Sequence, residues 1–553
     1  MAALFETHRA MLEGALAASR ARGYWSAFPE VPSGKIYGET AKDDGLAAFR
    51  ARLNAPFALP GHPAQGEAGG EVSPYGGALG VRYPAASADS LIAAAQAAMP
   101  DWAAATPEAR VGVCLEILKR LNARSFEIAN AVMQTTGQGF PMAFQAGGPH
   151  AQDRGLEAVA YAWEAMSRTP ATAEWTKQEG RGEPVVLEKR WRIVPRGIGL
   201  VIGCNTFPTW NSYAGLFASL ATGNPVIVKP HPQAVLPLAI TVEVCRAVLA
   251  EQGFDPNVAT LAAENPGGEM AKALVGRPEI ALIDYTGGPA FGGWVRANAG
   301  AAQVFSEEAG VNSVVVAGTD DFKGMCANLA FSLALYSGQM CTAPQAIYVP
   351  RGGIATDEGP RSFDEVAQGI AAATDRLLGD PARAAAVCGA LAAESTVERV
   401  REAAGLGRVV RASGPVEGME GARTATPLIL AVDAAETDAH LEERFGPIAF
   451  VVAVDDAADG LARAAASARE RGAITAAVYA TDPAFLDAAE AAFAAAGANL
   501  SCNLTGGVYV NQSAAFSDFH ATGANPAANA CFTDLAFVAS RFRVAAARRP
   551  KAA

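Results

Sequence analysis

Hydrophobic positions recur at helical spacing over residues 87–166. Apolar residues there stand three and four positions apart, as in Leu91, Ala94, Ala95 and Ala98. This spacing aligns them along one face of a helix. A shorter segment, 4–21, has a similar pattern at the start of the chain. The pattern therefore predicts one N-terminal helix and, after residue 87, a block of helices.

Beyond residue 195 the pattern changes to short apolar runs, which lie at 198–203, 225–229, 258–261, 280–283 and 302–305. Helical segments such as 236–251 and 269–275 separate them. Strands that alternate with helices at this interval form parallel βαβ units with right-handed crossovers. The prediction is an α/β fold with a doubly wound, Rossmann-type sheet, which binds ligands at the carboxyl ends of its strands.

A second alternating region extends from residue 314 to about 528, with strand-like runs at 346–349, 448–453 and 476–479. Outside both regions, residues 184–195 alternate and are rich in β-branched side chains, which predicts a hairpin strand. Residues 535–540 are predicted to form an edge strand that can add to a neighbour's sheet. The chain is thus expected to form two α/β lobes.

Composition narrows the class of protein. The chain has 553 residues, 50% of them hydrophobic and 18% charged, which is typical of a globular protein. A formal charge of −12 argues against nucleic acid or an anionic membrane as a partner. No apolar run reaches the length of a membrane span, and Glu6, His8 and Arg9 stand where a secretory signal would be apolar. We therefore expect a cytoplasmic protein.

The eight cysteines and six histidines are dispersed, and no Cys-x-x-Cys pair occurs. Neither a zinc cluster nor a disulfide framework is therefore expected, and the prediction for a metal is none. A cysteine with a special role would act alone. Cys341 is a candidate because it follows a helical stretch that stops at Gly338, on a loop bounded by Pro344. The alternative is that Cys341 is a small buried hydrophobic residue.

Other candidates stand near predicted strand ends. Glu307 and Glu308 follow the run 302–305, where a carboxylate can act as a general base or lie at a solvated strand end. Asn205 lies between a strand and a helix and can donate to an oxyanion or be a turn residue. Further candidates at strand ends or loops are Lys229, the glycines Gly287 and Gly288, and the loop around Glu443. Each signal is modest in isolation.

Taken together and in this order, these segments resemble the aldehyde dehydrogenase superfamily over roughly residues 75–545. The matching motifs are Asn205-Thr-Phe-Pro208, Lys229-Pro230, Tyr285-Thr-Gly-Gly288, Glu307 with Gly310 and Asn312, Gly338-Gln-Met-Cys341 and Glu443-Arg-Phe-Gly-Pro447. Six matches in register are far more specific than any one of them.

The resemblance implies roles for these residues. Cys341 would be the nucleophile, Glu307 the base for deacylation and Asn205 the oxyanion donor. The cofactor-binding residues would be Lys229 for the adenine ribose, Gly287 and Gly288 for the pyrophosphate, and Glu443 and Phe445 for the nicotinamide ribose and ring.

The resemblance also implies a domain organisation. Residues 1–75 would be an N-terminal extension, and residues 76–182 with 196–307 the dinucleotide-binding domain. Residues 308–528 would be the catalytic domain, and residues 183–195 with 529–548 an oligomerisation element. The implied assembly is a homodimer or homotetramer.

Two departures from the family pattern bear on catalysis. Thr206 separates Asn205 from Phe207, where many relatives have Asn-Phe-Pro, so the oxyanion role can shift. Glu308-Ala309 and Val311 replace the commoner Leu-Gly and Lys, which leaves Glu308 as a rival base.

A third departure bears on the cofactor. Pro232 stands three residues after Lys229, where NAD-preferring relatives often have a glutamate that binds the ribose 2′-hydroxyl. Its absence removes an obstacle to a 2′-phosphate. On this basis NADP is favoured slightly over NAD.

Within the superfamily, segments 4–8, 23–26, 511–520 and 523–526 are most similar to the PaaN-type phenylacetic acid degradation proteins. That resemblance implies oxidation of an open-chain acyl-CoA semialdehyde, a product of ring opening, to the carboxylic acid. Two alternatives remain: an aldehyde dehydrogenase that acylates CoA or takes another small aldehyde, and a catalytically silent interaction protein.

Overall fold

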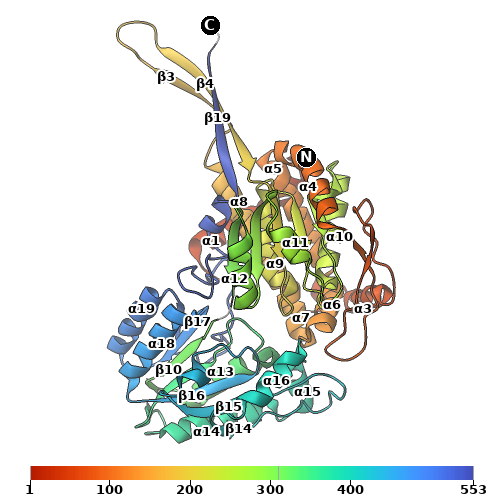
Figure 1. The fold of residues 1–553 in the computed structure, drawn as a ribbon. Helices are drawn as coiled ribbons and strands as arrows, with labels where there is room; N and C mark the ends of the chain where they lie inside the picture. Colours follow the sequence, from red (N-terminus) through yellow and green to blue (C-terminus); the bar gives the residue numbers. More distant parts are fainter. Residues whose placement is uncertain (1, 309, 552–553) are drawn as a thin grey trace.

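The computed structural model describes residues 2–308 and 310–551. The departure at Ala309 lies outside the described residues. Two large sheets, one parallel and one mostly parallel, organise most of the chain, and each forms the centre of its own region (Figure 1). No helix in the described part of the chain has both the length and the hydrophobicity needed to cross a membrane.

The first region is built on the doubly wound sheet that the sequence predicted. Its five strands are parallel and lie in the order β7-β6-β5-β8-β9. Their bounds are β5 Ile198–Ile202, β6 Val226–Lys229, β7 Ala259–Leu261, β8 Ile280–Thr286 and β9 Gln303–Glu307. The connecting helices are α9 Pro208–Ala221, α10 Leu236–Glu251, η1 Pro256–Val258, α11 Met270–Val275 and α12 Pro289–Asn298.

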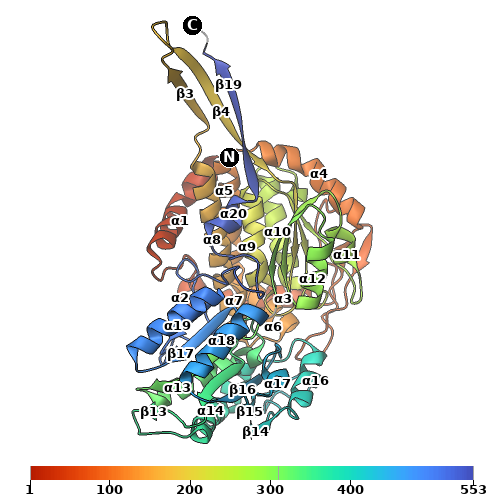
Figure 2. The same ribbon diagram turned by 60° about the vertical axis from the view of Figure 1, so that its left-hand side comes forward.

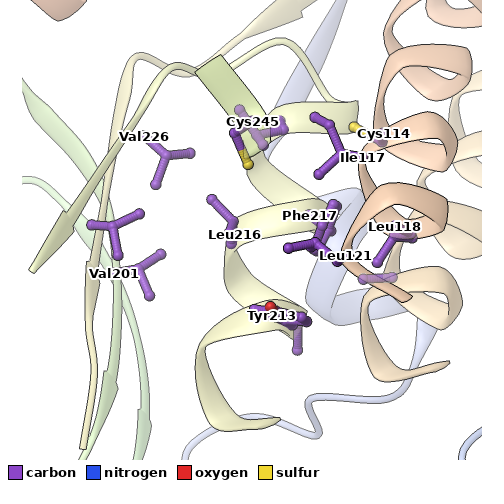
Figure 3. Close-up of a cluster of buried hydrophobic side chains, with 14 of the residues drawn as sticks. Cys114, Ile117, Leu118, Leu121, Val201, Tyr213, Leu216, Phe217, Val226 and Cys245 are labelled. Atoms are coloured by element: carbon purple, nitrogen blue, oxygen red, sulfur yellow. The ribbon is translucent and has the colours of Figure 1, made fainter. Parts of the chain in front are cut away.

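The predicted helical block packs against this sheet region. It consists of α4 Ala88–Ala104, α5 Pro107–Ala123, α6 Ser125–Thr136, α7 Phe140–Gly147 and α8 Pro149–Ser167. Figure 3 shows Leu118 and Leu121 of α5 facing Phe217 of α9 in a fully buried cluster. Burying an aromatic or aliphatic side chain of this size contributes about 1.5–3 kcal/mol. The helical block therefore fixes α9, the helix that follows Asn205.

The N-terminal segment packs onto the same block. It contains α1 Ala2–Ala21, α2 Gly34–Tyr37, α3 Ala41–Arg52, β1 Gly66–Ala68 and β2 Tyr83–Ala85. Phe5, Leu12 and Ala15 of α1 are buried in the core that includes α5 and α8. The Trp25 ring also meets the edge of Phe516, with ring centroids 5.0 Å apart. The start of the chain therefore supports a loop close to its end.

The second region contains a seven-stranded sheet in the order β14-β15-β16-β12-β10-β17-β18, in which only the β14–β15 pair is antiparallel. The strands are β10 Ser313–Val316, β12 Ala346–Pro350, β14 Arg408–Arg411, β15 Leu428–Asp433, β16 Ile448–Val454, β17 Thr475–Tyr479 and β18 Asn499–Cys502. A separate two-stranded sheet pairs β11 Gly318–Thr319 with β13 Ala355–Thr356.

Helices cover the second sheet. They are α13 Phe322–Ala334, η2 Leu335–Gly338, α14 Phe363–Leu378, α15 Pro381–Cys388, α16 Glu394–Ala403, α17 Thr437–His440, α18 Ala457–Arg471 and α19 Pro483–Ala496. Their apolar faces bury the sheet on both sides, since its two faces belong to different hydrophobic clusters. The second α/β lobe predicted from the sequence is thus present.

A three-stranded arm projects from the body (Figures 1 and 2). It is formed by β3 Thr172–Lys177, β4 Val185–Pro195 and β19 Phe542–Pro550, with β4 in the centre. The predicted hairpin strand at 184–195 is confirmed, whereas the predicted strand at 535–540 is wrong. Residues Leu535–Ala539 form helix α20 instead. The Asp534 side chain accepts the N–H of Phe537 at the start of this helix, and Phe537 and Val538 are buried.

Candidate active site

One cleft of about 1220 Å³ contains every site residue predicted from the sequence. It opens at the carboxyl ends of the five-stranded sheet and is closed by loops of the second region. The predicted residues that line it are Asn205, Lys229, Gly287, Gly288, Glu307, Cys341, Glu443 and Phe445. Segments separated by more than a hundred residues therefore meet at one place, as a doubly wound sheet predicts.

A tight turn mounts Cys341 at the inner part of this cleft. After α13, Tyr336 and Ser337 adopt left-handed φ angles of 51° and 49°. Gly338 follows, and a Cβ there would lie 2.5 Å from the carbonyl oxygen of Gly446. Asn312 then fixes the loop, because its Nδ2 donates to the carbonyl oxygens of Cys341 at 2.8 Å and Ala343 at 2.9 Å. The thiol is thus held by a rigid backbone.

Glu307 and His520 stand beside this thiol. His520 Nε2 lies 2.9 Å from Glu307 Oε2 and 4.0 Å from Cys341 Sγ. Both side chains are almost fully buried, at 1% exposure for Glu307 and 3% for His520. The three groups form one hydrogen-bonded cluster that joins the end of β9, the cysteine loop and a loop near the C-terminus.

The cluster sets the protonation of its members. Burial raises the pKa of Glu307, but the charge and hydrogen bond of His520 outweigh it, so the pKa of Glu307 lies below its usual value. Burial and the negative Glu307 raise the pKa of the Cys341 thiol well above its usual value. Before a ligand binds, the arrangement therefore favours a thiol next to a carboxylate.

Glu308, the rival base, points elsewhere. Its carboxylate pairs with Arg296 on α12, and a Cβ on Gly292 would lie 2.4 Å from its Cδ. The carboxylate therefore sits against α12, whereas that of Glu307 faces the thiol. The geometry supports Glu307 as the base.

Asn205 lies where β5 gives way to α9. Cys204 shapes this turn, since its Sγ accepts the N–H of Phe207 at 3.4 Å. The Oδ1 of Asn205 is buried without a hydrogen-bond partner among the described residues. The Asn205 amide therefore faces the same cleft as Cys341 and still has capacity for a ligand.

At the other end of the cleft, Lys229 is paired with Glu264. The two side chains form a salt bridge and are 7% and 9% exposed. Glu264 follows β7, the strand next to β6 in the sheet. Glu264 was not among the residues predicted from the sequence, although its position three residues after a strand end is one where ligand-binding side chains are expected.

Gly287 and Gly288 lie between β8 and the N-terminus of α12. The N–H of Gly287 donates to the carbonyl of Glu307 at 3.1 Å. A Cβ on Gly288 would point into open space. The first N–H groups of α12 thus face a place where a phosphate can approach the backbone closely.

Glu443 and Phe445 reach the cleft from the loop before β16. Gln345, just after the cysteine loop, holds this segment: its Nε2 donates to the carbonyl of Glu442 at 2.8 Å, and its Oε1 accepts the N–H of Arg444 at 2.6 Å. Burial raises the pKa of Glu443 to about 7. Gln345 therefore ties the Glu443 loop to the segment that follows Cys341.

This set of groups fits a nicotinamide dinucleotide. A buried lysine–carboxylate pair suits the adenosine ribose, the N-terminus of α12 suits the pyrophosphate, and Glu443 suits the second ribose. Which of these residues contact the cofactor stays a prediction.

Comparison with known proteins decides the family. Residues 70–524 match the model described as "Aldehyde dehydrogenase family". The chain belongs to the aldehyde dehydrogenase family. It is therefore an enzyme of the class that its motifs indicated, and its fold is the aldehyde dehydrogenase fold.

Two curated proteins illustrate the similarity. The N-succinylglutamate 5-semialdehyde dehydrogenase of Burkholderia multivorans is 27% identical over 395 residues, which cover 70% of this chain and 75% of that protein. The vanillin dehydrogenase of Corynebacterium glutamicum is 26% identical over 288 residues, 51% of this chain and 56% of that protein.

Solved structures agree. An NAD-dependent aldehyde dehydrogenase from Burkholderia multivorans is 56% identical, covers 100% of this chain and 99% of its own, and superposes with a TM-score of 0.98. A 1-pyrroline-5-carboxylate dehydrogenase from Thermus thermophilus is 20% identical, with a TM-score of 0.74 over 96% of this chain and 99% of its own. The second likeness shows the fold alone.

Besides Glu264, His520 is a site residue of this aldehyde dehydrogenase for which the sequence predicted no role. The ligand-type atoms of Glu307, Cys341 and His520 lie within 4.8 Å of one another, although dispersed cysteines and histidines had led to the prediction of no metal cluster. Two nitrogen or oxygen ligands of one tetrahedral zinc ion would lie about 3.3 Å apart. The 2.9 Å between Nε2 and Oε2 fits a shared proton better.

Proposed function

We propose that this aldehyde dehydrogenase oxidises an aldehyde to the carboxylic acid through a thioester on Cys341, with NAD as cofactor. The observation that carries the proposal is the juxtaposition of Cys341 with Glu307 at the inner end of a cleft that has dinucleotide-binding groups at its other end. One cleft thus offers the nucleophile, the base and the cofactor groups together.

In the first step the S–H bond of Cys341 breaks and its proton passes to Glu307, while the sulfur attacks the aldehyde carbon and the carbonyl oxygen becomes an oxyanion. Glu307 releases this proton to solvent before the second step. The Asn205 amide and the backbone N–H of Cys341 are suited to donate to that oxygen. One such donor lowers the barrier by about 3–4 kcal/mol. The position of Asn205 supports this role, because its side-chain amide lines the same cleft as Cys341.

In the second step Glu307 takes a proton from water, which attacks the thioester carbon and releases the acid with regeneration of the thiol. The low pKa of Glu307 keeps it ionised and ready to accept that proton. When bound, the nicotinamide supplies the hydride acceptor between the two steps.

The cofactor choice rests on Glu264. The sequence favoured NADP because Pro232 replaces a ribose-binding glutamate, yet Glu264 brings a carboxylate to Lys229 from the neighbouring strand. A carboxylate accepts the hydrogen bond of a 2′-hydroxyl and repels a 2′-phosphate. The similar protein from B. multivorans is described as NAD-dependent, which supports the same choice here.

For the substrate we propose an open-chain acyl-CoA semialdehyde formed after ring opening of an aromatic compound. The support is the PaaN-like segments of the sequence, two of which are in contact: Trp25 packs on Phe516, with ring centroids 5.0 Å apart. The likeness to N-succinylglutamate 5-semialdehyde dehydrogenases is compatible with a semialdehyde.

The test is a screen of simple, aromatic and CoA-linked aldehydes with NAD and with NADP. We expect faster reduction of NAD than of NADP, the highest kcat/KM with the CoA-linked semialdehyde, and the free acid as product. If an acyl-CoA forms when CoA is added, the acceptor of the acyl group is CoA and not water. Absence of binding to either dinucleotide would overturn the proposal as a whole.

We further propose that the arm formed by β3, β4 and β19 joins two copies of this chain into a dimer, or pairs of dimers into a tetramer. Its outer strands present open edges, and it exposes Trp175, Val185, Val194 and Val544 to solvent. Light scattering should give a dimer or tetramer for the native chain and a monomer for Val194→Glu combined with Val544→Glu. A monomeric native chain would contradict this.

A further inference from the structure

The loop that carries His520 is tied to the rest of the active site from several sides. It follows β18, and a later part of the same segment runs along the edge of β9: Asn529 Oδ1 accepts the N–H of Ser306 at 2.7 Å, and Glu308 N donates to the Ala527 carbonyl at 2.7 Å. Since β9 ends at Glu307, this segment is hydrogen-bonded to the strand that carries the base.

Helix α8 forms hydrogen bonds to the same segment of the chain, a few residues before His520. Arg154 and Glu157 form a buried ion pair at 2.8 Å. Arg154 Nη2 donates to Ser513 Oγ at 3.0 Å, and Glu157 Oε1 accepts the N–H of Phe516 at 3.0 Å. A buried ion pair with further hydrogen bonds holds a segment in one arrangement.

The imidazole ring itself is fixed. The backbone N–H of His520 donates to Thr533 Oγ1 at 2.9 Å, which fixes the main chain, and the ring packs edge-to-face with Trp210 with centroids 4.6 Å apart. These contacts leave Nε2 pointing at Glu307 Oε2. A separation of 2.9 Å between a nitrogen and a carboxylate oxygen requires one proton between them, because two lone pairs at that distance repel.

The two oxygens of Glu307 therefore differ. Oε2 is held by His520, whereas Oε1 is buried without a hydrogen-bond partner among the described residues. A base needs one oxygen anchored, so that the carboxylate keeps its direction, and one oxygen available for the proton it accepts. The cluster supplies both.

We propose that His520 is a positioning residue that donates its Nε2–H to Glu307 Oε2 and so keeps the carboxylate ionised and turned toward the Cys341 thioester. The inference rests on the proposed function and deepens it. In deacylation the O–H bond of water breaks, its proton passes to Glu307 Oε1, and its oxygen bonds to the thioester carbon. The C–S bond then breaks, and the sulfur of Cys341 recovers the proton from Glu307.

Two substitutions at this position separate a hydrogen-bond role from a packing role. His520→Phe keeps a ring against Trp210 but removes the donor, and His520→Gln keeps a donor. For His520→Phe we expect the pre-steady-state burst of reduced cofactor to persist while the steady-state rate at pH 6 falls by about tenfold or more. The acidic limb of the rate–pH profile should move to higher pH, because loss of the donor raises the pKa of Glu307. His520→Gln should recover most of the rate.

A measurement without cofactor or turnover tests the same point. Infrared difference spectra of the unliganded protein follow the carboxylic acid band of Glu307 against pH, with Glu307→Gln identifying the band. We expect the band to titrate at higher pH in His520→Phe than in the native protein. Unchanged titration together with an unchanged acidic limb would overturn the inference, even if the enzyme oxidises aldehydes as proposed. Conversely, the band could shift in His520→Phe while the native protein oxidises no aldehyde. That result would establish the hydrogen bond and contradict the proposed function.

The chain offers a matched control. His8 on α1 is also buried, and its Nε2 lies 2.7 Å from Glu116 Oε2, outside the cleft. His8→Phe should leave the burst, the acidic limb and the Glu307 band unchanged. If His8→Phe reproduced the changes of His520→Phe, the effect would be a general consequence of losing a buried histidine, and the inference would fail. Equal loss of rate in His520→Phe and His520→Gln, with an unmoved acidic limb, would also contradict it.

Discussion

The two ends of the cleft are built in different ways. At the dinucleotide end, Lys229 is the last residue of a strand of one parallel sheet, and Glu264 and Gly287 follow two other strands of that sheet. At the catalytic end, Glu307 is the last residue of a strand, Cys341 lies on a loop of the second region and His520 lies on a loop near the C-terminus.

This difference concerns how tightly each end is fixed. The dinucleotide end uses regular backbone, and beside the buried Lys229–Glu264 salt bridge the Gly288 backbone stays open to a ligand. At the catalytic end, hydrogen bonds from Asn312 and to Thr533 fix the backbone of Cys341 and His520 before any ligand binds. Substitutions at the catalytic end should therefore affect chemistry, and those at the other end should affect affinity and selectivity.

The largest effect should come from Cys341→Ala. Without the sulfur no thioester forms, so turnover should fall on the order of 10³-fold or more. Stopped-flow absorbance of the reduced cofactor should show neither burst nor steady state. The control is Cys502→Ala, because Cys502 ends β18 outside the cleft. Retained turnover in Cys341→Ala would end the covalent mechanism.

Next in size is Glu307→Gln, which should keep the burst and then stall, with the steady-state rate reduced about 10²–10³-fold because no base activates water. Acyl-enzyme should accumulate and be detectable by mass spectrometry. Glu308→Gln serves as the comparison, since Glu308 pairs with Arg296. A stall in Glu308→Gln with a normal rate in Glu307→Gln would move the base by one residue.

A smaller effect is expected at the dinucleotide end. Glu264→Gln removes the charge that repels a 2′-phosphate and leaves Lys229 to attract it, so the ratio of NAD to NADP affinity should fall about tenfold. Fluorescence titration of the two reduced cofactors measures this directly. The burst amplitude at saturating NAD should not change. An unchanged ratio would mean that the ribose is recognised elsewhere.

The smallest effect concerns pH. Glu443 has a pKa of about 7 because it is buried, so it is mostly ionised at pH 8 and mostly protonated at pH 6. Since the ionised form accepts ribose hydroxyl hydrogen bonds better, the KM for the cofactor should rise about two- to fivefold from pH 8 to pH 6. In Glu443→Gln, steady-state kinetics across this pH range should show no such rise in the KM for the cofactor. A rise that persists in the variant would assign it to another group.

Much of the dinucleotide end could be predicted from the sequence because local pattern determines it. The apolar runs became β5 to β9, and Lys229, Gly287 and Gly288 follow from where those runs stop. Glu264 escaped prediction because its partner is on a neighbouring strand, and strand order cannot be read from spacing alone. The segment 535–540 was misassigned for a similar reason: an apolar run of that length suits a short helix or a strand until capping and burial decide.

The sequence by itself determined the alternation of strands and helices, the position of Cys341 after a tight turn and the family, because these depend on residues close together in the chain. Only the tertiary structure decided which of two adjacent glutamates faces the thiol, which carboxylate meets Lys229 and that His520 completes the cluster. Each of those outcomes depends on side-chain direction and on contacts between different strands, helices and loops, and both are set by how these elements pack against one another.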